Sequence, residues 1–325
     1  MSDWPITIDD VRAARERLLS HLVPTPLRSY GTLDAAVGAG IRVLVKHENF
    51  QPTGAFKVRN ALSALLALDP VRRARGVVAA TRGNHGLGLA WTARALSVPA
   101  TVCVPLGNNP EKNAAVRALS ARLVEEGRDY DESVAAAERL VRAEGLALVH
   151  STNDAAVVAG AGTVTLEMLE EAPAIDALVF SVGGGSQAVG GLTVARALRP
   201  GLPVYAVQAA GASAIHDAWH LGRPVSHPSA DTFADGLATR NTYPFTFGAL
   251  REGLAGFVTV TDAQIAEALR LLLQTTHTLV EGAGAAGLAG LVALREALAG
   301  RTVGIVLSGA NVDLATLGRV VRREI

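Results

Sequence analysis

Short β-branched hydrophobic runs alternate along most of the chain with longer alanine- and leucine-rich segments of helical periodicity. A few apolar residues bounded by turn residues are typical of buried strands. We therefore predict strands at Val77–Ala80, Thr101–Val104, Leu146–Val149, Leu178–Val182, Val204–Gln208, Val258–Val260 and Val303–Leu307. Strands that alternate with helices form parallel sheets covered on both faces, so the pattern predicts an α/β fold.

The periodic segments between these runs predict helices. They lie near Asp9–His21, Phe56–Leu68, Leu87–Leu96, Glu111–Leu119, Tyr130–Glu144, Gly160–Glu171, Gln187–Arg199, Asp262–Thr275, Ala283–Leu298 and Leu314–Arg323. The longest stretch without either periodicity runs from Gly222 to Pro244. We expect it to form a loop near the functional site.

Composition and charge exclude several classes of function. With 325 residues and 49% hydrophobic content, the chain can bury a large core in one α/β unit or in two lobes. Its 30 basic and 30 acidic residues cancel, which disfavours a nucleic-acid partner or an anionic membrane surface. The longest apolar stretch, Gly282 to Leu294, is too short to cross a bilayer.

The N-terminus and the single cysteine indicate a cytoplasmic protein. Met1 to Pro5 lacks a basic region followed by an apolar run, so we expect no secretory signal. Cys103 cannot form an internal disulfide, and it lies in an apolar run where a buried structural thiol is expected.

Lysine is scarce, with three residues against 27 arginines. Only a lysine can present a neutral amine for Schiff-base chemistry, because arginine keeps its proton. Lys57 follows a Pro-Thr-Gly turn at the entry of an apolar-periodic segment, whereas Lys46 ends the apolar run Ile41–Val45 and Lys112 lies in a polar helix start. Lys57 is therefore the candidate, although for one isolated lysine a solvated position in the first helical turn would be the favoured interpretation.

A glycine run joins a predicted strand to a predicted helix at Gly183-Gly184-Gly185-Ser186. Converging backbone amides and the positive end of a helix favour a phosphate at such a loop. The run also satisfies a loose dinucleotide pattern, but the next strand ends in Gln208 where an acidic residue is expected, which disfavours a dinucleotide. A tight turn without any ligand is the alternative.

Two further strand ends carry polar residues. Thr81-Arg82-Gly83-Asn84-His85 follows one strand, and its glycine permits close approach to a small ligand. Ser308 stands at the end of the last strand, where open α/β sheets bind ligands. Each signal is weak alone, but together they provide an amine, a phosphate cradle, a carboxylate-sized loop and a hydroxyl.

This combination resembles the fold type II pyridoxal-phosphate (PLP) enzymes, specifically the threonine/serine dehydratase group that also contains serine racemase. The matching segments occur in family order. They are Thr25-Pro26-Leu27, Glu48 to Ala61, Gly83 to Gly86, Gly183 to Ser186, Ala234 to Ala238, Glu281 to Ala286 and Ser308 to Asn311.

The resemblance implies a role for each matched residue. Lys57 would form the Schiff base with pyridoxal 5′-phosphate and act as the catalytic residue. The residues implied to bind the cofactor are Phe56, Lys57, Asn84, Gly183, Gly184, Gly185, Ser186, Glu281 and Ser308. The residues implied to bind the substrate are Thr81, Arg82, Gly83, Asn84 and His85. From the residues alone, Glu281 is also compatible with a helix N-terminal charge, and His85 with a core histidine.

The chain departs from the family pattern at several positions. Ala55 replaces the serine of the Ser-Phe-Lys motif, Asn60 replaces the glycine of Arg-Gly-Ala, and Ser186 replaces the fourth cradle glycine. Gln208 and Ala214 stand where some relatives have acidic ligands for a divalent cation, so we expect no metal site.

One further departure from the family pattern affects the expected reaction. Arg82 stands where racemases have a serine base.

Three histidines form a possible metal site. His216 and His220 are four residues apart and His227 follows, but no cysteine or carboxylate completes a zinc set, so an exposed histidine-bearing helix is favoured.

The resemblance implies a two-domain enzyme, which we expect to be a homodimer. Residues 1–48 and 150–325 would form a large PLP-binding domain, and residues 49–149 a small nested α/β domain, with the site in the cleft. We expect β-elimination from a hydroxy amino acid such as threonine or serine, giving a 2-oxo acid and ammonia. The alternatives are a dehydratase for 3-hydroxyaspartate or another 3-hydroxy amino acid, a serine racemase, a β-replacement synthase and a non-catalytic binding protein.

Overall fold

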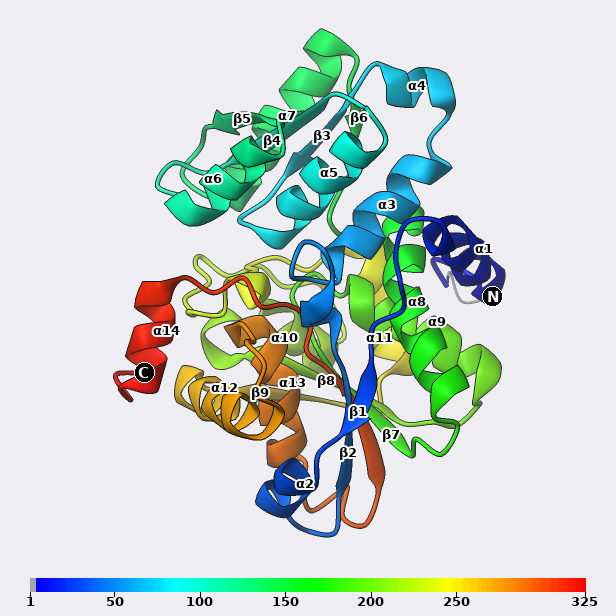
Figure 1. Cartoon of the computed structure of the whole chain (residues 1–325), viewed down its shortest axis with the longest axis vertical. Helices are drawn as coiled ribbons and strands as arrows, with labels where there is room; N and C mark the ends of the chain where they lie inside the picture. Colours follow the sequence, from blue (N-terminus) through cyan, green and yellow to red (C-terminus); the bar gives the residue numbers. More distant parts are fainter. Residues whose placement is uncertain (1–3) are drawn as a thin grey trace.

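The computed structural model describes residues 4–325, which form two sheets flanked by helices (Figure 1). The larger sheet has the order β1 (Leu27–Ser29), β2 (Arg42–Lys46), β10 (Thr302–Val306), β7 (Ala177–Ser181), β8 (Val204–Ala209) and β9 (Gly256–Val260). The smaller sheet has the order β5 (Arg122–Glu125), β4 (Ala100–Val104), β3 (Val77–Ala80) and β6 (Ala147–Leu148). All neighbouring strands are parallel except β1 and β2, which confirms the predicted fold class.

The helices occupy most of the remaining chain. They are α1 (Ile8–Leu19), α2 (Gly31–Val37), α3 (Lys57–Ala67), α4 (Pro70–Ala74), α5 (Asn84–Ala95), α6 (Pro110–Ala118), α7 (Tyr130–Glu144), α8 (Ala155–Glu171), α9 (Ser186–Leu198), α10 (Ala214–Leu221), α11 (Pro244–Gly253), α12 (Asp262–Thr276), α13 (Gly282–Ala293) and α14 (Leu314–Val321). Three short 3₁₀ helices are η1 (Glu48–Phe50), η2 (Ala210–Ala212) and η3 (Asp235–Leu237). Within residues 4–325, no helix combines the length and hydrophobicity needed to span a bilayer.

The seven predicted strands and ten predicted helices are all present, with shifted ends. Two shifts are equally the largest. Helix α13 ends at Ala293 and not at Leu298. Helix α8 begins at Ala155 and not at Gly160, because the Asp154 side chain accepts hydrogen bonds from the Ala156 and Val157 amides. The sequence pattern did not predict β1, β5, α2, α4 and α11, which are short or carry polar ends. The Ile41–Val45 run contributes β2.

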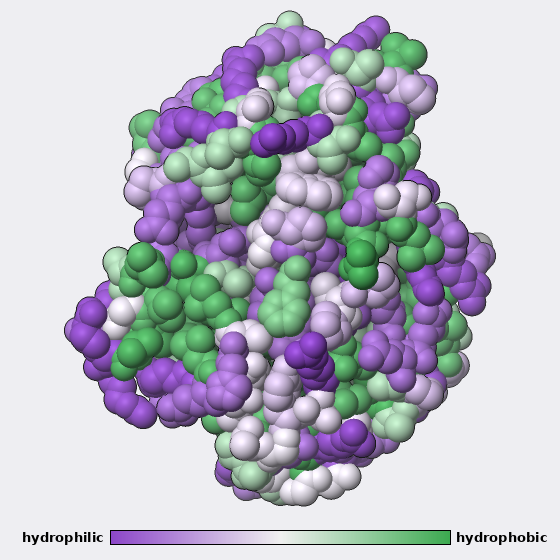
Figure 2. Space-filling view, in the orientation of Figure 1, coloured by the Kyte–Doolittle hydropathy of each residue, from purple (hydrophilic) through white to green (hydrophobic). Residues whose placement is uncertain are grey.

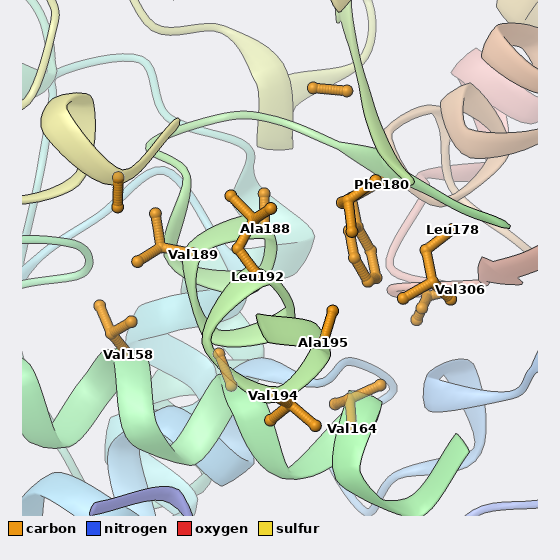
Figure 3. Close-up of a cluster of buried hydrophobic side chains, with 14 of the residues drawn as sticks. Val158, Val164, Leu178, Phe180, Ala188, Val189, Leu192, Val194, Ala195 and Val306 are labelled. Carbon is orange, nitrogen blue, oxygen red and sulfur yellow. The ribbon is translucent and has the colours of Figure 1, made fainter. Parts of the chain in front are cut away.

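Strand β7 is hydrophobic at its first four positions, Ala177 to Phe180, because both of its faces are buried. Leu178 and Phe180 belong to the core cluster beneath α8 and α9 (Figure 3), whereas Ala177 and Val179 belong to the cluster on the opposite face. Successive side chains of a strand point to opposite faces, so a strand covered by helices on both sides has no polar face.

Helix α3 is held close to α8, and this contact fixes the position of Lys57. Gly160 permits the approach, because a Cβ atom there would lie 2.6 Å from the Arg59 carbonyl oxygen. The same two helices are joined by Arg59, whose side chain is 2% exposed and forms ion pairs with Glu48 at 2.8 Å and Glu167 at 2.6 Å. Lys46 completes a buried quartet through Glu167, also at 2.6 Å.

All four strands of the smaller sheet lie between residues 77 and 148, and their unit occupies the upper part of Figure 1. The larger sheet takes strands from both ends of the chain. The domain limits at residues 48/49 and 149/150 stay a prediction, because α3 packs against both α5 and α8.

Candidate active site

One cavity is lined by every site residue that the sequence predicts. Its walls come from the start of α3, the β3–α5 turn, the β7–α9 turn, the start of α13 and the segment after β10. The parallel strands β3, β7 and β10 end at this cavity, which explains why their C-terminal turns meet there. The predicted residues brought together are Phe56, Lys57, Thr81, Arg82, Gly83, Asn84, His85, Gly183, Gly184, Gly185, Ser186, Glu281 and Ser308.

Lys57 is the first residue of α3 and places its amine inside the cavity. The Nζ atom lies 3.3 Å from the Ser186 Oγ atom and 4.8 Å from the centroid of the Phe56 ring. Burial lowers the pKa of Lys57 to about 8. A larger fraction of the amine is therefore neutral near physiological pH than for an exposed lysine, as nucleophilic attack on an aldehyde requires.

The glycine run between β7 and α9 leaves no room for side chains. A Cβ atom on Gly183 would lie 2.2 Å from the Gly236 carbonyl oxygen, and one on Gly184 would lie 2.1 Å from the Thr152 Oγ1 atom. Gly185 caps α9 with a φ of +95°, which favours glycine. The run therefore exposes backbone amides at the N-terminus of a 13-residue helix.

Two of the departures from the expected motifs lie side by side in this cradle. Asn60 on α3 donates a hydrogen bond of 3.4 Å from its Nδ2 atom to the Ser186 Oγ atom. The same Ser186 oxygen accepts from Lys57. Neither contact exists with glycine at both positions, so the cradle of this chain carries an additional hydroxyl whose orientation α3 controls.

A chain of hydrogen bonds fixes the Asn84 side chain. Its Nδ2 atom donates to the Glu281 Oε1 atom at 2.5 Å, and its Oδ1 atom accepts from the Asn311 Nδ2 atom at 2.8 Å. Glu281 is 6% exposed, and burial raises the pKa of its carboxyl group to about 7. The carboxyl group thus exchanges its proton near neutral pH beside the cavity.

His85 is a neutral histidine whose ring is fixed by the backbone. Its Nε2 atom lies 2.9 Å from the Val149 carbonyl oxygen, which selects the tautomer with the proton on Nε2. Burial, together with the charge of Lys57, lowers the pKa of His85 to about 3. His85 therefore does not carry a charge to the substrate, in accord with the interpretation of this residue as a core histidine.

Comparison with known proteins decides the family. Residues 18–309 match the family described as pyridoxal-phosphate dependent enzyme. The chain belongs to this family. It is 39% identical over 285 residues to an L-threonine ammonia-lyase of Geobacter sulfurreducens, covering 87% of this chain and 71% of that protein. It is 36% identical over 305 residues to an L-threo-3-hydroxyaspartate ammonia-lyase of a Pseudomonas species, covering 94% and 95%.

The solved structures agree with this assignment. The structure of maize serine racemase superposes with a TM-score of 0.92 at 29% identity, covering 99% of this chain and 98% of that one. The fold is therefore that of the fold type II PLP-dependent enzymes, as the sequence motifs predicted.

The residues of this PLP-dependent enzyme fit the cofactor. The amides of Gly183 to Gly185 and the start of α9 suit the dianionic phosphate, and the Lys57 amine suits the aldehyde. Ser308 is 5% exposed and adds a hydroxyl to the lining of the same cavity, which suits a polar atom of the cofactor ring. The individual roles of these residues stay predictions.

Sequence reasoning missed several residues at the site. Lys112 lies at the start of α6, as predicted, and its side chain also reaches into the cavity, where its Nζ atom lies 2.6 Å from the Asp235 Oδ2 atom. Its scarcity as one of three lysines was the available signal. Asn311 lay within a matched motif, yet only the structure shows its bond to Asn84. Tyr130 and Thr152 also line the cavity without any sequence signal.

The unpatterned stretch from Gly222 to Pro244 does lie at the site, as expected, since Asp235 to Thr239 and Tyr243 line the cavity. Where acidic cation ligands occur in some relatives, the buried Gln208 accepts a hydrogen bond of 3.0 Å from the His216 amide. His216 bonds Asp217 at 2.8 Å and packs against the His220 ring. Within the described chain, no group of three histidine, cysteine or acidic side chains has the geometry for a metal ion.

Proposed function

We propose that this enzyme is an ammonia-lyase that converts a 3-hydroxy L-amino acid into a 2-oxo acid and ammonia. The observation that carries the proposal is the Lys57 amine, with a pKa of about 8, in one cavity with the Gly183–Ser186 cradle and the Ser308 hydroxyl. The names of the two relatives described above, both ammonia-lyases, support the same reaction class.

In this proposal Lys57 has two successive tasks. It first holds the cofactor, and once a substrate amine replaces it, its free amine takes the proton from the substrate α-carbon. PLP, when bound, supplies the electron-poor ring that makes this α-proton acidic. The lowered pKa of Lys57 keeps the freed amine competent as a base near neutral pH. The β-hydroxyl then leaves as water, and hydrolysis of the released enamine gives the 2-oxo acid and ammonia.

Ser308 favours elimination over other reactions of the cofactor. A neutral hydroxyl such as that of Ser308 would hold the ring nitrogen of PLP without giving it a proton as an aspartate would. The cofactor would then supply a weaker electron sink, so loss of a β-leaving group would be favoured over transamination.

Serine racemase is the second candidate, because the maize serine racemase structure is so similar. Racemisation needs a second acid/base on the opposite face of the substrate, and in this chain Arg82 stands where racemases have a serine. Arginine keeps its proton up to a pKa of about 12 or above, so it does not serve as that base. We therefore expect D-serine to form at less than about one hundredth of the rate of pyruvate.

The experiment is a panel of L-threonine, L-serine and L-threo-3-hydroxyaspartate offered to the PLP-loaded enzyme. The proposal expects 2-oxo acid and ammonia in equal amounts from at least one of them. Chiral analysis of the remaining serine tests the racemase alternative. D-serine that accumulates as fast as pyruvate would overturn the assignment, and consumption of serine without ammonia would indicate β-replacement.

We further propose a cytoplasmic homodimer. Hydrophobic residues gather at the α14 side of the molecule (Figure 2), where Leu314 and Val321 are 78% and 58% exposed. The proposed cytoplasmic location is supported by Cys103, the one cysteine, which is buried and forms no disulfide. Light scattering during gel filtration tests the homodimer, which requires about twice the chain mass of 33.6 kDa. Fluorescence of a tagged protein in its own cell tests the location.

A further inference from the structure

Arg82 has no counter-charge within the part of the chain that the structure describes. It lies in the β3–α5 turn, lines the central cavity together with Lys57, and also lines two smaller hollows at the rim of that cavity. Its Nε atom is fully buried without a hydrogen-bond partner. Among the side chains that the structure describes, no carboxylate forms a salt bridge with Arg82.

The acidic side chains that share these cavities with Arg82 are already engaged. Asp235 pairs with Lys112 at 2.6 Å, and Asp129 pairs with Arg240 at 3.1 Å. Each pair joins a hydrogen-bond donor and an acceptor of opposite charge. These two carboxylates therefore neutralise other cations and leave the charge of Arg82 for a ligand.

Two further acids have other tasks. Asp313 caps α14 through hydrogen bonds to Thr316 at 2.7 and 3.0 Å. Glu281 accepts from Asn84, and burial raises the pKa of Glu281 to about 7, so that a large part of its population is neutral. Glu281 therefore offers Arg82 less than a full negative charge, whereas Asp313 stays ionised but uses its oxygens to hold the start of α14.

The α-carboxylate of an amino-acid substrate has a separate place in the same turn. Asn84, His85 and Gly86 open α5, a helix of 12 residues, and the first amides of a helix have no acceptor within it. These amides and the positive end of the helix dipole are suited to bind the α-carboxylate, which every amino-acid substrate has. The guanidinium of Arg82 is then an additional anion site beside it.

We propose that Arg82 binds a second carboxylate, on the side chain of the substrate, and makes this enzyme selective for 3-hydroxy amino acids with an acidic side chain. This inference rests on the proposed ammonia-lyase function and narrows its substrate class. The planar fork of arginine binds a carboxylate through two parallel hydrogen bonds, which neither the methyl group of threonine nor the hydrogen of serine provides. The preferred substrate is a 3-hydroxyaspartate, which yields oxaloacetate and ammonia with no other reactant.

The test compares kcat/KM of four PLP-loaded proteins on L-threo-3-hydroxyaspartate and on L-threonine. Arg82→Ala should lose about 100-fold on 3-hydroxyaspartate and less than about threefold on threonine, because only the former loses a desolvated charge partner. Arg82→Lys keeps the charge without the fork and should lose about tenfold on 3-hydroxyaspartate. The matched control is Arg128→Ala, since Arg128 shares one rim hollow with Arg82 but is exposed and does not line the central cavity.

Two outcomes overturn the inference. Equal losses on both substrates in Arg82→Ala indicate that Arg82 serves the α-carboxylate or the fold. A wild-type enzyme that prefers threonine to 3-hydroxyaspartate also contradicts it. Circular dichroism and the absorbance of the bound cofactor report, independently of activity, that each variant is folded and loaded.

A binding measurement separates this inference from the function on which it rests. If no substrate yields a 2-oxo acid, the ammonia-lyase proposal fails, and calorimetry with the unreactive acids succinate and butyrate still tests Arg82. We expect wild type to bind succinate about 100-fold more tightly than Arg82→Ala does, with butyrate nearly unaffected. Equal affinity of both proteins for succinate overturns the side-chain role of Arg82.

Discussion

Burial brings two ionisable residues of the site toward neutrality from opposite directions. The pKa of Lys57 falls to about 8, and that of Glu281 rises to about 7, because a cavity with little water disfavours either charged form. Groups that titrate near neutral pH are suited to move protons. Substitution of Lys57 or of Glu281 should therefore have a measurable effect.

Lys57→Ala and Lys57→Arg should both lower kcat by at least about 1000-fold, because neither side chain supplies a neutral amine. Circular dichroism should show an unchanged fold. Borohydride treatment of the loaded wild-type protein, followed by peptide mapping, should find the cofactor on Lys57. Lys112 reaches the same cavity, so a label on Lys112 would refute the assignment.

Glu281→Gln should stabilise the cofactor-free protein above neutral pH. The carboxyl group has a pKa of about 7 when folded against 4.5 in the unfolded chain, so between these values the folded state holds a proton that the unfolded state releases. The unfolding free energy of wild type therefore falls as pH rises through this window. The variant should gain nothing below pH 4.5 and up to about 3 kcal/mol above pH 7.

Urea unfolding of both proteins at about pH 4, 6 and 8 measures this difference. A gain that is independent of pH would show that lost packing or hydrogen bonding, and not the proton, determines the effect. The introduced glutamine side chain retains an oxygen that can accept from Asn84, which keeps the comparison close to one of charge alone.

Among the helices and strands, the anchoring of α3 sets the position of Lys57. Lys57 is its first residue, and Arg59, one half-turn on, is bonded to Glu48 before α3 and to Glu167 on α8. With Lys46 the quartet has two charges of each sign, so no net charge is buried. Such pairing is the condition under which a charge survives in a core.

Arg59→Met should destabilise the protein by about 3–5 kcal/mol, because it leaves a buried carboxylate without its cation. Urea unfolding measures the change. Arg122→Met is the control, since it removes the exposed ion pair between Arg122 and Glu144 and should cost less than about 1 kcal/mol. Similar losses for both variants would mean that the buried quartet has no special role.

For the molecule as a whole, the two sheet units meet at one cavity whose described residues include no metal cluster. Gln208 and the apolar Ala214 stand where some relatives have cation ligands, and a hard cation prefers carboxylate oxygens. Activity should therefore change by less than about twofold after chelation with EDTA. A large loss that magnesium or calcium restores would reveal another set of ligands.

The sequence determined the local structure and the chemical parts of this protein. Hydrophobic periodicity and turn residues act over a few positions, so they predicted the buried strands such as β7 and the strand-to-helix junctions that carry Lys57, Gly183 and Ser308. They did not predict the start of α8, where an aspartate cap overrides periodicity, or the edge strand β5.

Only the tertiary structure decided which of these parts act together. Asn84 and Glu281 are 197 residues apart in sequence yet bonded at 2.5 Å, and Lys112 enters the cavity through its bond to Asp235. Burial, and with it the pKa of Lys57, is likewise a property of the packed chain. Whether Arg82 forms an ion pair with a carboxylate of the protein depends on the positions of loops that are distant in sequence. Hydrophobic patterns along a chain do not predict those positions.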